Sequence, residues 1–395
     1  MTAVVLIAVM VDRRAITFRT LAIAALIVLV VTPEALVHPS FQMSFAATLG
    51  LVALVQVGMP ALFATSESSR TARLALWGGR ELVVLLLASL VAGFATMPYA
   101  AYHFHRITPY GVVANLLAMP VVSGLVMPAG LLGLAAVPFG FDGVFWQLME
   151  LGLRWMIGVA MWVTALPGAI GRMPAFGVGP VIVASLGIVL LALLRTPLRY
   201  AGVVVLAGAV AWAALTTQPD ILISSDGHSV AVRGADGRLH VMRSSKDAFL
   251  VKEWLAADAD ARSPIDASVS DGVSCDPSGC VTALADRALV ALTMLPDALA
   301  EDCDRAAVIV TTRQPSADCR AMVIGRARLE SQGAMTLRRS GEGFVIEASR
   351  AANLDRPWAR GSIDGEKAGA STGSRARPGP VDATPAETEL RPDEQ

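Results

Sequence analysis

The chain has 395 residues, of which 54% are hydrophobic and 16% are charged, and its formal net charge is −1. These averages hide a partition: residues 1–216 contain eleven Arg, no Lys and six acidic residues, whereas residues 217–395 contain 21 basic and 27 acidic ones. The partition excludes a soluble globular protein as a description of the whole chain. It predicts a helical membrane domain followed by a water-soluble domain.

Apolar segments recur through the first part, most of them close to the roughly 20 residues that a helix needs to cross a bilayer. They lie at 1–11, 17–31, 40–64, 82–101, 111–137, 144–166, 176–194 and 200–216. The first is too short to cross alone and lacks the features of a signal peptide. We interpret it as the remnant of a longer helix, which predicts seven to eight spans in a chain truncated at its amino terminus.

The distribution of arginine orients these segments. Eight Arg lie in the alternate loops 12–19, 65–80 and 195–199, whereas the other loops carry only Arg106 and Arg172. Loops rich in Arg face the cytoplasm under the positive-inside rule. Residues 217–395 are therefore expected in the periplasm.

The segment 144–166 is the ambiguous one. Its residues Gln147, Glu150 and Arg154 form one polar stripe on a helix, and the last two are spaced to pair at i, i+4. Such a helix either crosses the membrane or lies along its surface. Only crossing agrees with the orientation that Arg195 and Arg199 predict.

All four cysteines lie in the second part, at Cys275, Cys280, Cys303 and Cys319. The sequence Cys-Asp-Pro-Ser-Gly-Cys at 275–280 brackets a turn, so a hairpin would bring its two sulfurs together. A periplasmic address would let both pairs oxidise. A zinc site and reduced buried cysteines remain alternatives, although the spacing lacks the paired knuckles of a zinc ribbon.

The soluble part, 217–355, is expected to be a small α+β domain. Alternating polarity and the turns Asp226-Gly227 and Asp236-Gly237 predict three antiparallel strands. A helix is predicted at 246–256 and a short one at 297–304. Further strands are predicted at 280–284, 287–294, 306–312, 321–324, 334–340 and 343–349. The tail 356–395 is rich in Gly, Ala, Ser, Pro and acidic residues, which is typical of disorder.

Several polar residues in the membrane part need partners that hydrocarbon cannot provide. Ser40, Gln42 and Ser44 stand at the start of the segment 40–64, where they could cap the helix, bond to another helix or serve transport. We predict that another helix satisfies Gln42 and that the partner is Asn115. Asn115 itself either bonds to a neighbouring helix or faces an aqueous path.

The loop after the segment 82–101 contains His103, His105 and Arg106. These residues fit a solvated interfacial loop, and they could also contact phosphates. Farther along, Pro120, Gly124 and Pro128 interrupt an apolar helix, either as an ordinary kink or as unwound backbone beside a pore.

Two stretches resemble the ComEC-type competence domain. PEALVHPSFQMSFAATLGL resembles its signature of a Pro-containing loop followed by a helix beginning Phe-Gln-(apolar)-Ser-Phe. YHFHRITPYGVVANLLAMPVVSGLVMPAGLL, residues 102–132, resembles its later signature of an aromatic-basic loop and an Asn-Leu-Leu-x-x-Pro helix. The resemblance covers roughly residues 1–200 and implies an inner-membrane channel through which single-stranded DNA enters during natural transformation.

The chain departs from the family pattern in two respects. The resemblance implies an amino-terminal membrane segment, an OB-like domain and further spans, which the 395 residues do not include and which agree with the expected truncation. The His-x-His-x-Asp-His cluster of the family's metallo-β-lactamase-like domain is missing, and His103-Phe-His105 is a poor metal site. The resemblance therefore implies no enzyme activity, no cofactor and no catalytic metal, and it suggests that the soluble domain is a remnant of that fold.

The resemblance implies several partners: single-stranded DNA, the lipid bilayer, other DNA-uptake proteins and a separate cytoplasmic motor, because the chain has no Walker motif. The sequence leaves a homo-oligomer open. A structural or assembly protein and a solute transporter are the alternative functions. A transporter would need an internal repeat or buried charges, of which Glu150 is the only clear acidic one.

Overall fold

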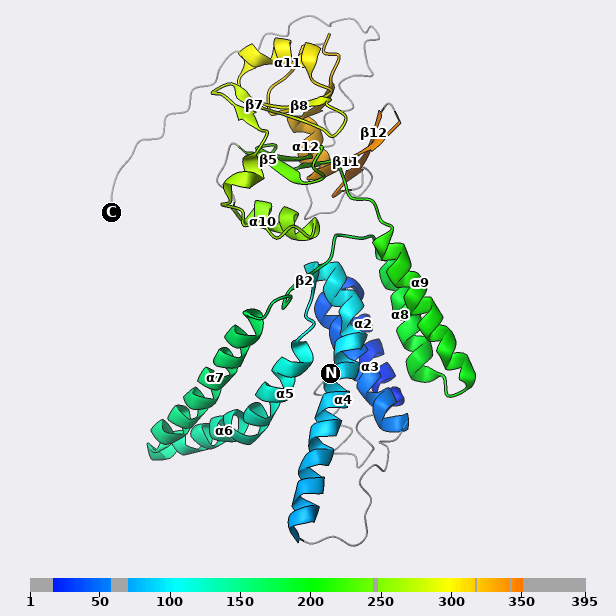
Figure 1. The fold of residues 1–395 in the computed structure, drawn as a ribbon, viewed down its shortest axis with the longest axis vertical. Coiled ribbons are helices and arrows are strands. Elements are labelled where there is room, and N and C mark those ends of the chain that lie inside the picture. Colours follow the sequence, from blue (N-terminus) through cyan, green and yellow to red (C-terminus); the bar gives the residue numbers. More distant parts are fainter. Residues whose placement is uncertain (1–16, 58–69, 244–247, 317, 342, 351–395) are drawn as a thin grey trace, which may run out of the picture.

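The computed structural model describes residues 17–57, 70–243, 248–316, 318–341 and 343–350 of the chain. Helices form the first part of this structure, and two β-sheets with short helices form the second part (Figure 1). The predicted apolar segment 1–11 and the predicted disordered tail 356–395 lie outside the described residues.

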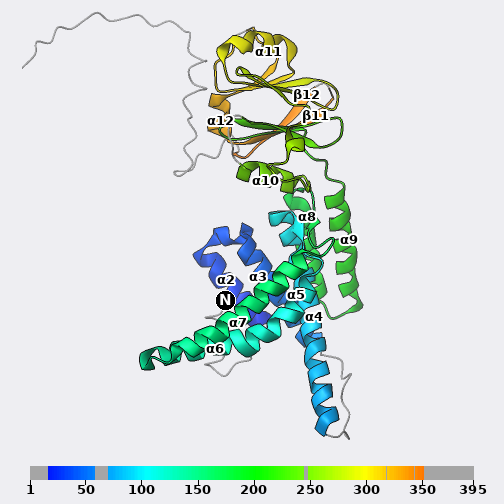
Figure 2. The same cartoon turned by 60° about the vertical axis from the view of Figure 1, so that its left-hand side comes forward.

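The helical part divides into two groups. One group contains α2 (Phe18–Val31), α3 (Pro39–Val57), α4 (Arg70–Phe104), α8 (Val178–Leu193) and α9 (Ala201–Ala214). The other contains α5 (Gly111–Val121), α6 (Met127–Ala136) and α7 (Asp142–Thr164). Figures 1 and 2 show that the second group extends away from the first. Within the described residues, three helical stretches are long and apolar enough to cross a membrane: Leu82–Phe104, Gly111–Phe139 and Pro197–Ala214.

Helix α4 is longer than the predicted segment 82–101, since it begins at Arg70. The added stretch is rich in Arg, Leu and Ala, which favour helix without being apolar throughout, so a hydropathy pattern does not detect it. Helix α3 packs antiparallel to α4. A Cβ on Gly50 would lie 2.9 Å from Cγ1 of Val91 and 3.3 Å from Cβ of Ala95, so the two helices approach closely there.

The predicted interruption of the segment 111–137 takes the form of a wider helical turn. A π-helical turn, Val122–Val126, joins α5 to α6, and Pro120 lies just before it. Proline has no amide to donate to the regular ladder, and π turns appear in helices as such local defects. The stretch therefore stays helical but bends away from α4 (Figure 2).

Both ends of the helical part have distinct neighbours. The connection between α8 and α9 lies at the end remote from the β-sheets, whereas the short strands β1 (Arg106–Ile107) and β2 (Gly171–Arg172) lie at the near end (Figure 1). Helix α7 runs antiparallel to α6 and returns the chain to the near end. The loops containing Arg106 and Arg172 therefore share one end with the soluble domain, as the predicted alternation requires.

The first sheet of the soluble domain confirms the predicted hairpins. Its strands are β3 (Ile221–Ile223), β4 (Ser229–Arg233), β5 (Leu239–Arg243), β11 (Met335–Ser340) and β12 (Gly343–Ala348). They are antiparallel in the order β12-β11-β3-β4-β5. Gly227 and Gly237 adopt φ values of 70° and 76°, the left-handed conformation that such tight turns require.

The second sheet combines antiparallel and parallel pairing. Its strands are β6 (Ser274–Cys275), β7 (Gly279–Ala283), β8 (Leu289–Thr293), β9 (Val308–Thr311) and β10 (Met322–Gly325), in the order β10-β9-β8-β7-β6. β6, β7 and β8 are antiparallel, whereas β8, β9 and β10 are parallel. The sequence did not predict β6 or the short helix α12 (Arg326–Gln332).

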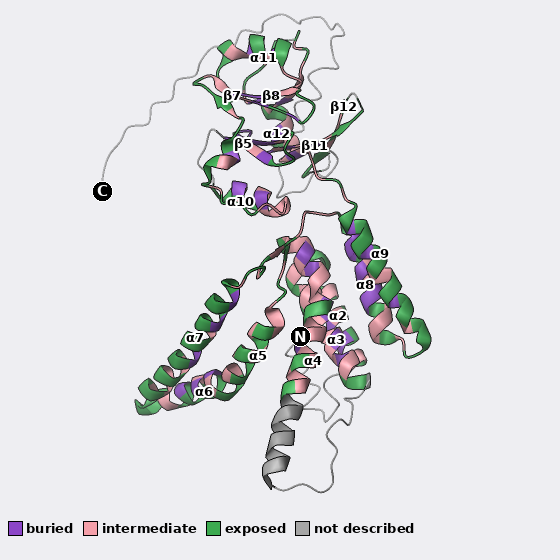
Figure 3. Ribbon diagram, in the orientation of Figure 1, coloured by how far each residue is buried: buried purple, intermediate pink, exposed green. Residues whose placement is uncertain are grey.

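The two sheets pack face to face, and alternate residues of each strand point to opposite sides. Val230 and Val232 face Val290 and Val308 across the central core. On the outer side of the first sheet, α10 (Ala248–Ala257) covers a second cluster that includes Ala231 and Val241. On the outer side of the second sheet, α11 (Leu299–Arg305) covers a third cluster with Ala291 and Ile309. Figure 3 shows buried residues in these layers and also along helices such as α7 and α8.

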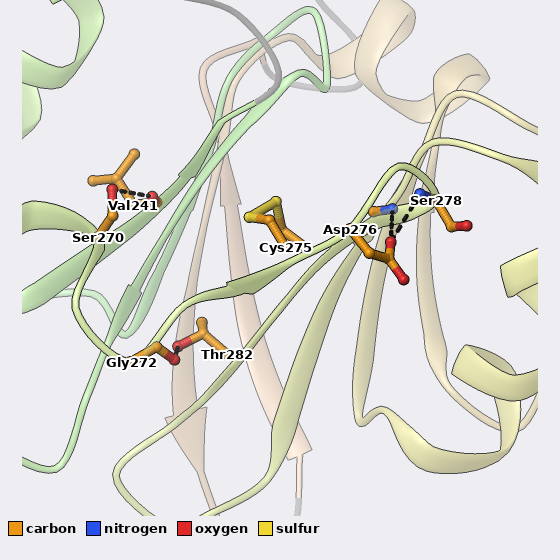
Figure 4. The surroundings of a disulfide bond; sticks show 9 residues. Val241, Ser270, Gly272, Cys275, Asp276, Ser278 and Thr282 are labelled. Atoms are coloured by element: carbon orange, nitrogen blue, oxygen red, sulfur yellow. Dashed lines mark hydrogen bonds between the residues drawn. A yellow bond between two sulfur atoms is a disulfide. The ribbon is translucent and has the colours of Figure 1, made fainter.

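Two disulfides lie in and beside the second sheet. Cys275 pairs with Cys280 across the β6–β7 hairpin, with 4.1 Å between their Cα atoms. Figure 4 shows this bond beside the turn, in which the Asp276 carboxylate accepts hydrogen bonds from the amides of Ser278 and Gly279, both 2.8 Å. The second disulfide joins Cys303 of α11 to Cys319 before β10.

Candidate functional site

The polar residues at the near end begin with Gln42, in the first turn of α3. Its side-chain amide donates to the carbonyl oxygen of Leu36 at 2.9 Å, and its Oε1 lies 2.8 Å from Nε2 of His103 on α4. Another helix therefore satisfies Gln42, but the predicted partner Asn115 is wrong. The reason is the α3–α4 hairpin, which places the end of α4 rather than the start of α5 beside Gln42.

Ser40 and Ser44 lie on the exposed surface of α3. The amide of Ser40 donates to Nδ1 of His38 at 3.3 Å, and the carbonyl oxygen of Ser44 accepts from the Thr48 hydroxyl at 2.8 Å. These contacts are local to α3 and the turn before it. The structure brings neither serine together with Asn115 or Arg106.

His105 occupies the turn between α4 and β1 with φ 53°, a left-handed conformation that is uncommon outside glycine. Its carbonyl oxygen accepts from the amide of Met173, and its half-buried ring has no hydrogen-bond partner at Nδ1 among the described residues. Burial lowers the pKa of His105, and the Glu253 carboxylate on α10 offsets part of that effect. The imidazole is therefore neutral at pH 7 and does not supply a cation for phosphate.

Arg106 lies next, and the structure pairs it with a residue that the sequence left unassigned. In the antiparallel register of β1 and β2, Arg106 stands directly opposite Arg172, and both residues are exposed. Directly opposed residues have Cβ atoms about 5 Å apart, and like charges there repel. Two cationic residues placed opposite each other in this way form a site that an anion would stabilise.

Beside this pair, a cavity of about 310 Å³ opens between α4 and α5. Its polar lining residues come from both helices and from the loop between them: Ser89, Thr96, Thr108 and Asn115. Ile107 of β1 also lines it, so the cavity begins beside the paired arginines. None of the lining residues carries a charge.

Four residues of this region were not predicted from the sequence: Ser89, Thr96, Thr108 and Arg172. Ser89 is 8% exposed. The sequence signal that could have found it is a hydroxyl residue inside an apolar segment. Thr108 lies close to Arg106 in sequence and could have been included with it. Arg172 had no local signal, because its position opposite Arg106 depends on a pairing between two residues that are 66 positions apart in the sequence.

Glu150 and Arg154 form the predicted ion pair on α7, with 2.6 Å between Oε1 and Nη2. Their side chains are exposed, and neither lines the cavity between α4 and α5. The opposite side of α7 packs inward, where Gly152 meets Val126 of the π turn. The opposite charges of Glu150 and Arg154 therefore neutralise each other, and the ion pair is not part of the candidate site.

In the soluble domain, a second polar cavity lies between the β3–β4 turn, the end of β9 and α12. Its cations are already engaged, since Arg326 pairs with Glu330 and Nε of Arg313 donates to the carbonyl oxygen of Met294. Among the described residues, no group of three or more His, Cys, Asp and Glu side chains is placed to hold a metal ion. The strongest candidate site is therefore the arginine pair with the α4–α5 cavity.

Comparisons with known proteins place the helical part in a family. Neither the curated proteins nor the solved structures include a match to this chain. The family model described as Competence protein matches residues 1–198, which is half of the chain. With this match and three helices able to cross a bilayer, the chain is a membrane protein that belongs to the competence protein family.

Proposed function

We propose that the helical domain is an inner-membrane channel component that conducts single-stranded DNA during natural transformation. Membership of the competence protein family supports a role in DNA uptake. The observation that carries the proposal is the Arg106–Arg172 pair at the edge of an uncharged polar cavity between α4 and α5. Helix α5 and the loop that precedes it would form one wall of the route.

The chemistry of the site fits a polyanion in transit. Phosphates neutralise opposed guanidinium groups and relieve their mutual repulsion, so the pair would attract the strand. Hydroxyl and amide groups at Ser89, Thr96 and Asn115 offer hydrogen bonds without fixed charge. A cavity lining without acidic groups does not repel phosphate, and a lining without cations does not bind phosphate tightly. The strand could therefore pass through the cavity without being trapped.

The proposal includes an arrangement in the cell. Seven helical segments, α2, α3, α4, α5 with α6, α7, α8 and α9, would cross the inner membrane and leave residues 217–395 in the periplasm. The segregation of Arg between alternate loops supports this orientation. A separate cytoplasmic motor and other DNA-uptake proteins would be partners, and a homo-oligomer is compatible with the proposal.

We propose that the soluble domain is a remnant of a metallo-β-lactamase-like domain and does not act as a metal-dependent nuclease. The parallel strands β8, β9 and β10, with α11 between the first two, support the first part. The missing His-x-His-x-Asp-His sequence supports the second. A two-metal hydrolase needs His and carboxylate ligands that converge on both ions.

The test of channel function introduces one negative charge into the cavity. We expect Asn115→Asp, which keeps the size of the side chain, to lower transformation by about tenfold or more at unchanged protein level, since about 1.4 kcal/mol of added repulsion has that effect. Transformation frequency and an immunoblot of the membrane fraction provide the measurement. A strain in which the gene is deleted gives the background transformation frequency.

Gln147→Glu is the matched control. It makes the same amide-to-acid change on an exposed position of α7 that does not line the cavity, and it should leave transformation unchanged. Equal defects in the two variants would show that the α4–α5 cavity is not the route. A deletion strain that transforms normally would favour the alternatives, and its growth on single solutes would distinguish a transporter from a structural protein.

The periplasmic address has its own test. We expect all four cysteines of the protein made in cells to resist an alkylating reagent until a reductant is added, because periplasmic thiols oxidise and cytoplasmic ones do not. In a Cys275→Ser and Cys280→Ser double variant, Cys303 and Cys319 should still resist alkylation because they form a separate disulfide. Alkylation before reduction, or strong activity of a cytoplasm-specific reporter fused after Gln218, would overturn the orientation.

A further inference from the structure

A second cavity in the helical part lies where α3 and α4 meet α8 and α9. Its volume is about 340 Å³, within the range of roughly 300–1,000 Å³ that is typical of small-molecule sites. Ten of its eleven lining residues are apolar, and they come from all four helices: among them are Ala53, Val91, Ile188, Ala192 and Leu206. Phe94, 66% exposed, stands at its border.

The one charged residue of this lining is Arg199. It belongs to the 3₁₀ turn Pro197–Tyr200 that leads into α9, at the end of the helical part remote from the soluble domain. The residue is half-buried, and among the residues that the structure describes its guanidinium has neither an ion pair nor a hydrogen bond. A cation beside an apolar cavity is costly unless an anion meets it.

The neighbouring arginine behaves differently. Nη2 of Arg195 donates to Oε1 of Gln56 at 2.8 Å, which ties the end of α8 to the end of α3. This contact bridges two of the four helices that line the cavity. Arg195 is thus engaged in holding the helices together, whereas Arg199 is left to interact with a ligand.

We propose that this cavity binds an anionic phospholipid, with one acyl chain among α3, α4, α8 and α9 and the headgroup phosphate at Arg199. The ligand must have a long apolar part and one negative charge, because the lining offers one apolar cavity and one cation. Basic pockets between membrane helices recognise anionic headgroups for this reason. A small soluble anion would match Arg199 but would leave the cavity unfilled.

The position of the cavity gives the lipid a structural role. Helices α8 and α9 directly precede the soluble domain in the chain, and α3 and α4 contain the polar residues Gln42 and His103 at the near end. An acyl chain between the two pairs would fill the space that separates them and increase the contact that joins them. The bound lipid would therefore stabilise the whole helical group, with or without DNA.

The test compares two phospholipids on the purified full chain in neutral detergent. Native mass spectrometry and the thermal unfolding temperature are recorded with dioleoyl phosphatidylglycerol and with dioleoyl phosphatidylcholine, which share their acyl chains. We expect the chain to retain phosphatidylglycerol about fivefold more tightly, since one Arg near an anionic headgroup is worth about 1 kcal/mol. Equal binding of the two lipids would overturn the proposal.

Three variants assign the effect to the cavity. Arg199→Gln should abolish the preference for phosphatidylglycerol, and Arg199→Lys should keep most of it. Ala192→Phe, which fills the cavity, should weaken the binding of both lipids. Arg305→Gln, an equal charge change on an exposed helix of the soluble domain, is the control and should bind as the wild type does.

A preference that survives Arg199→Gln, or one that Arg305→Gln removes as well, would contradict the assignment. Should Arg199→Gln fail to fold, the comparison of Arg199→Lys with Ala192→Phe still tests the cavity. The assay contains no DNA, so its failure would leave the proposed channel function untouched. Conversely, a channel that fails the Asn115→Asp test could still bind lipid here.

Discussion

Replacing Asp258 by Ala should destabilise the soluble domain by about 3 kcal/mol, because it leaves the buried Arg233 charge unpaired. Both side chains are largely buried, with 17% of Arg233 and 10% of Asp258 exposed. Arg233 donates to both carboxylate oxygens, at 3.2 and 2.5 Å, and also to the carbonyl oxygens of Pro219 and Gly237. These contacts fasten the end of α10 to β4 and to the start of the domain.

The expected readout is a fall of the unfolding temperature on the order of 10 °C. It is measured as the temperature at which a protease begins to cut residues 217–350 in the purified full chain. Glu301→Ala is the control, since the Arg305–Glu301 pair is 71% and 66% exposed, and exposed pairs contribute about 1 kcal/mol or less. A loss for Asp258→Ala no larger than that of the control would show that Arg233 needs no partner.

Gly202→Ala should separate α8 from α9 and lower the amount of folded protein. An added Cβ would lie 2.7 Å from the carbonyl oxygen of Gly187 and 3.0 Å from the amide nitrogen of Leu191. These are backbone atoms of α8, so no side-chain rotation relieves the clash. Overpacking of this kind typically costs roughly 1–3 kcal/mol, and close approach through small residues is how membrane helices pack.

Gly208 lies on the same helix and provides the matched control. Apart from its chain neighbours and the nearby backbone of its own helix, no heavy atom lies within 4 Å of the position that its Cβ would take, and Ala favours helix over Gly by about 1 kcal/mol. Gly208→Ala should therefore keep or raise the protein level in the membrane fraction, measured by immunoblot and by size-exclusion chromatography. Similar behaviour of the two variants would mean that the α8–α9 contact does not depend on glycine.

Local chemistry explains what the sequence could predict. The Asp-Gly turns at 226–227 and 236–237 and the alternating polarity around them determined the strands of the first sheet, because both signals lie within a few residues. The i, i+4 spacing of Glu150 and Arg154 determined their ion pair in the same way. The helical segments followed from continuous apolar runs.

Contacts between distant segments explain what the sequence could not predict. The partner of Gln42 depends on which helix packs beside α3, and apolar surfaces of similar composition do not specify that choice. The opposition of Arg106 and Arg172 depends on a ladder of two residues, too short to leave an alternating pattern. Helix α12 has Ala327 and Leu329 as its only apolar residues, so it shows no apolar periodicity.

The two-residue ladder of β1 and β2 lies where the group α5–α7 joins the rest of the helical part. It holds the loops at the near end of α5 and α7 together, and the Tyr110 hydroxyl reinforces it by donating to the carbonyl oxygen of Pro167 at 3.1 Å. The far end of α6 and α7 extends away from the other helices (Figures 1 and 2). Because α7 has 23 residues, about 35 Å at helical rise, the group has the geometry of a lever, in which a small rotation at the ladder becomes a large displacement at its tip.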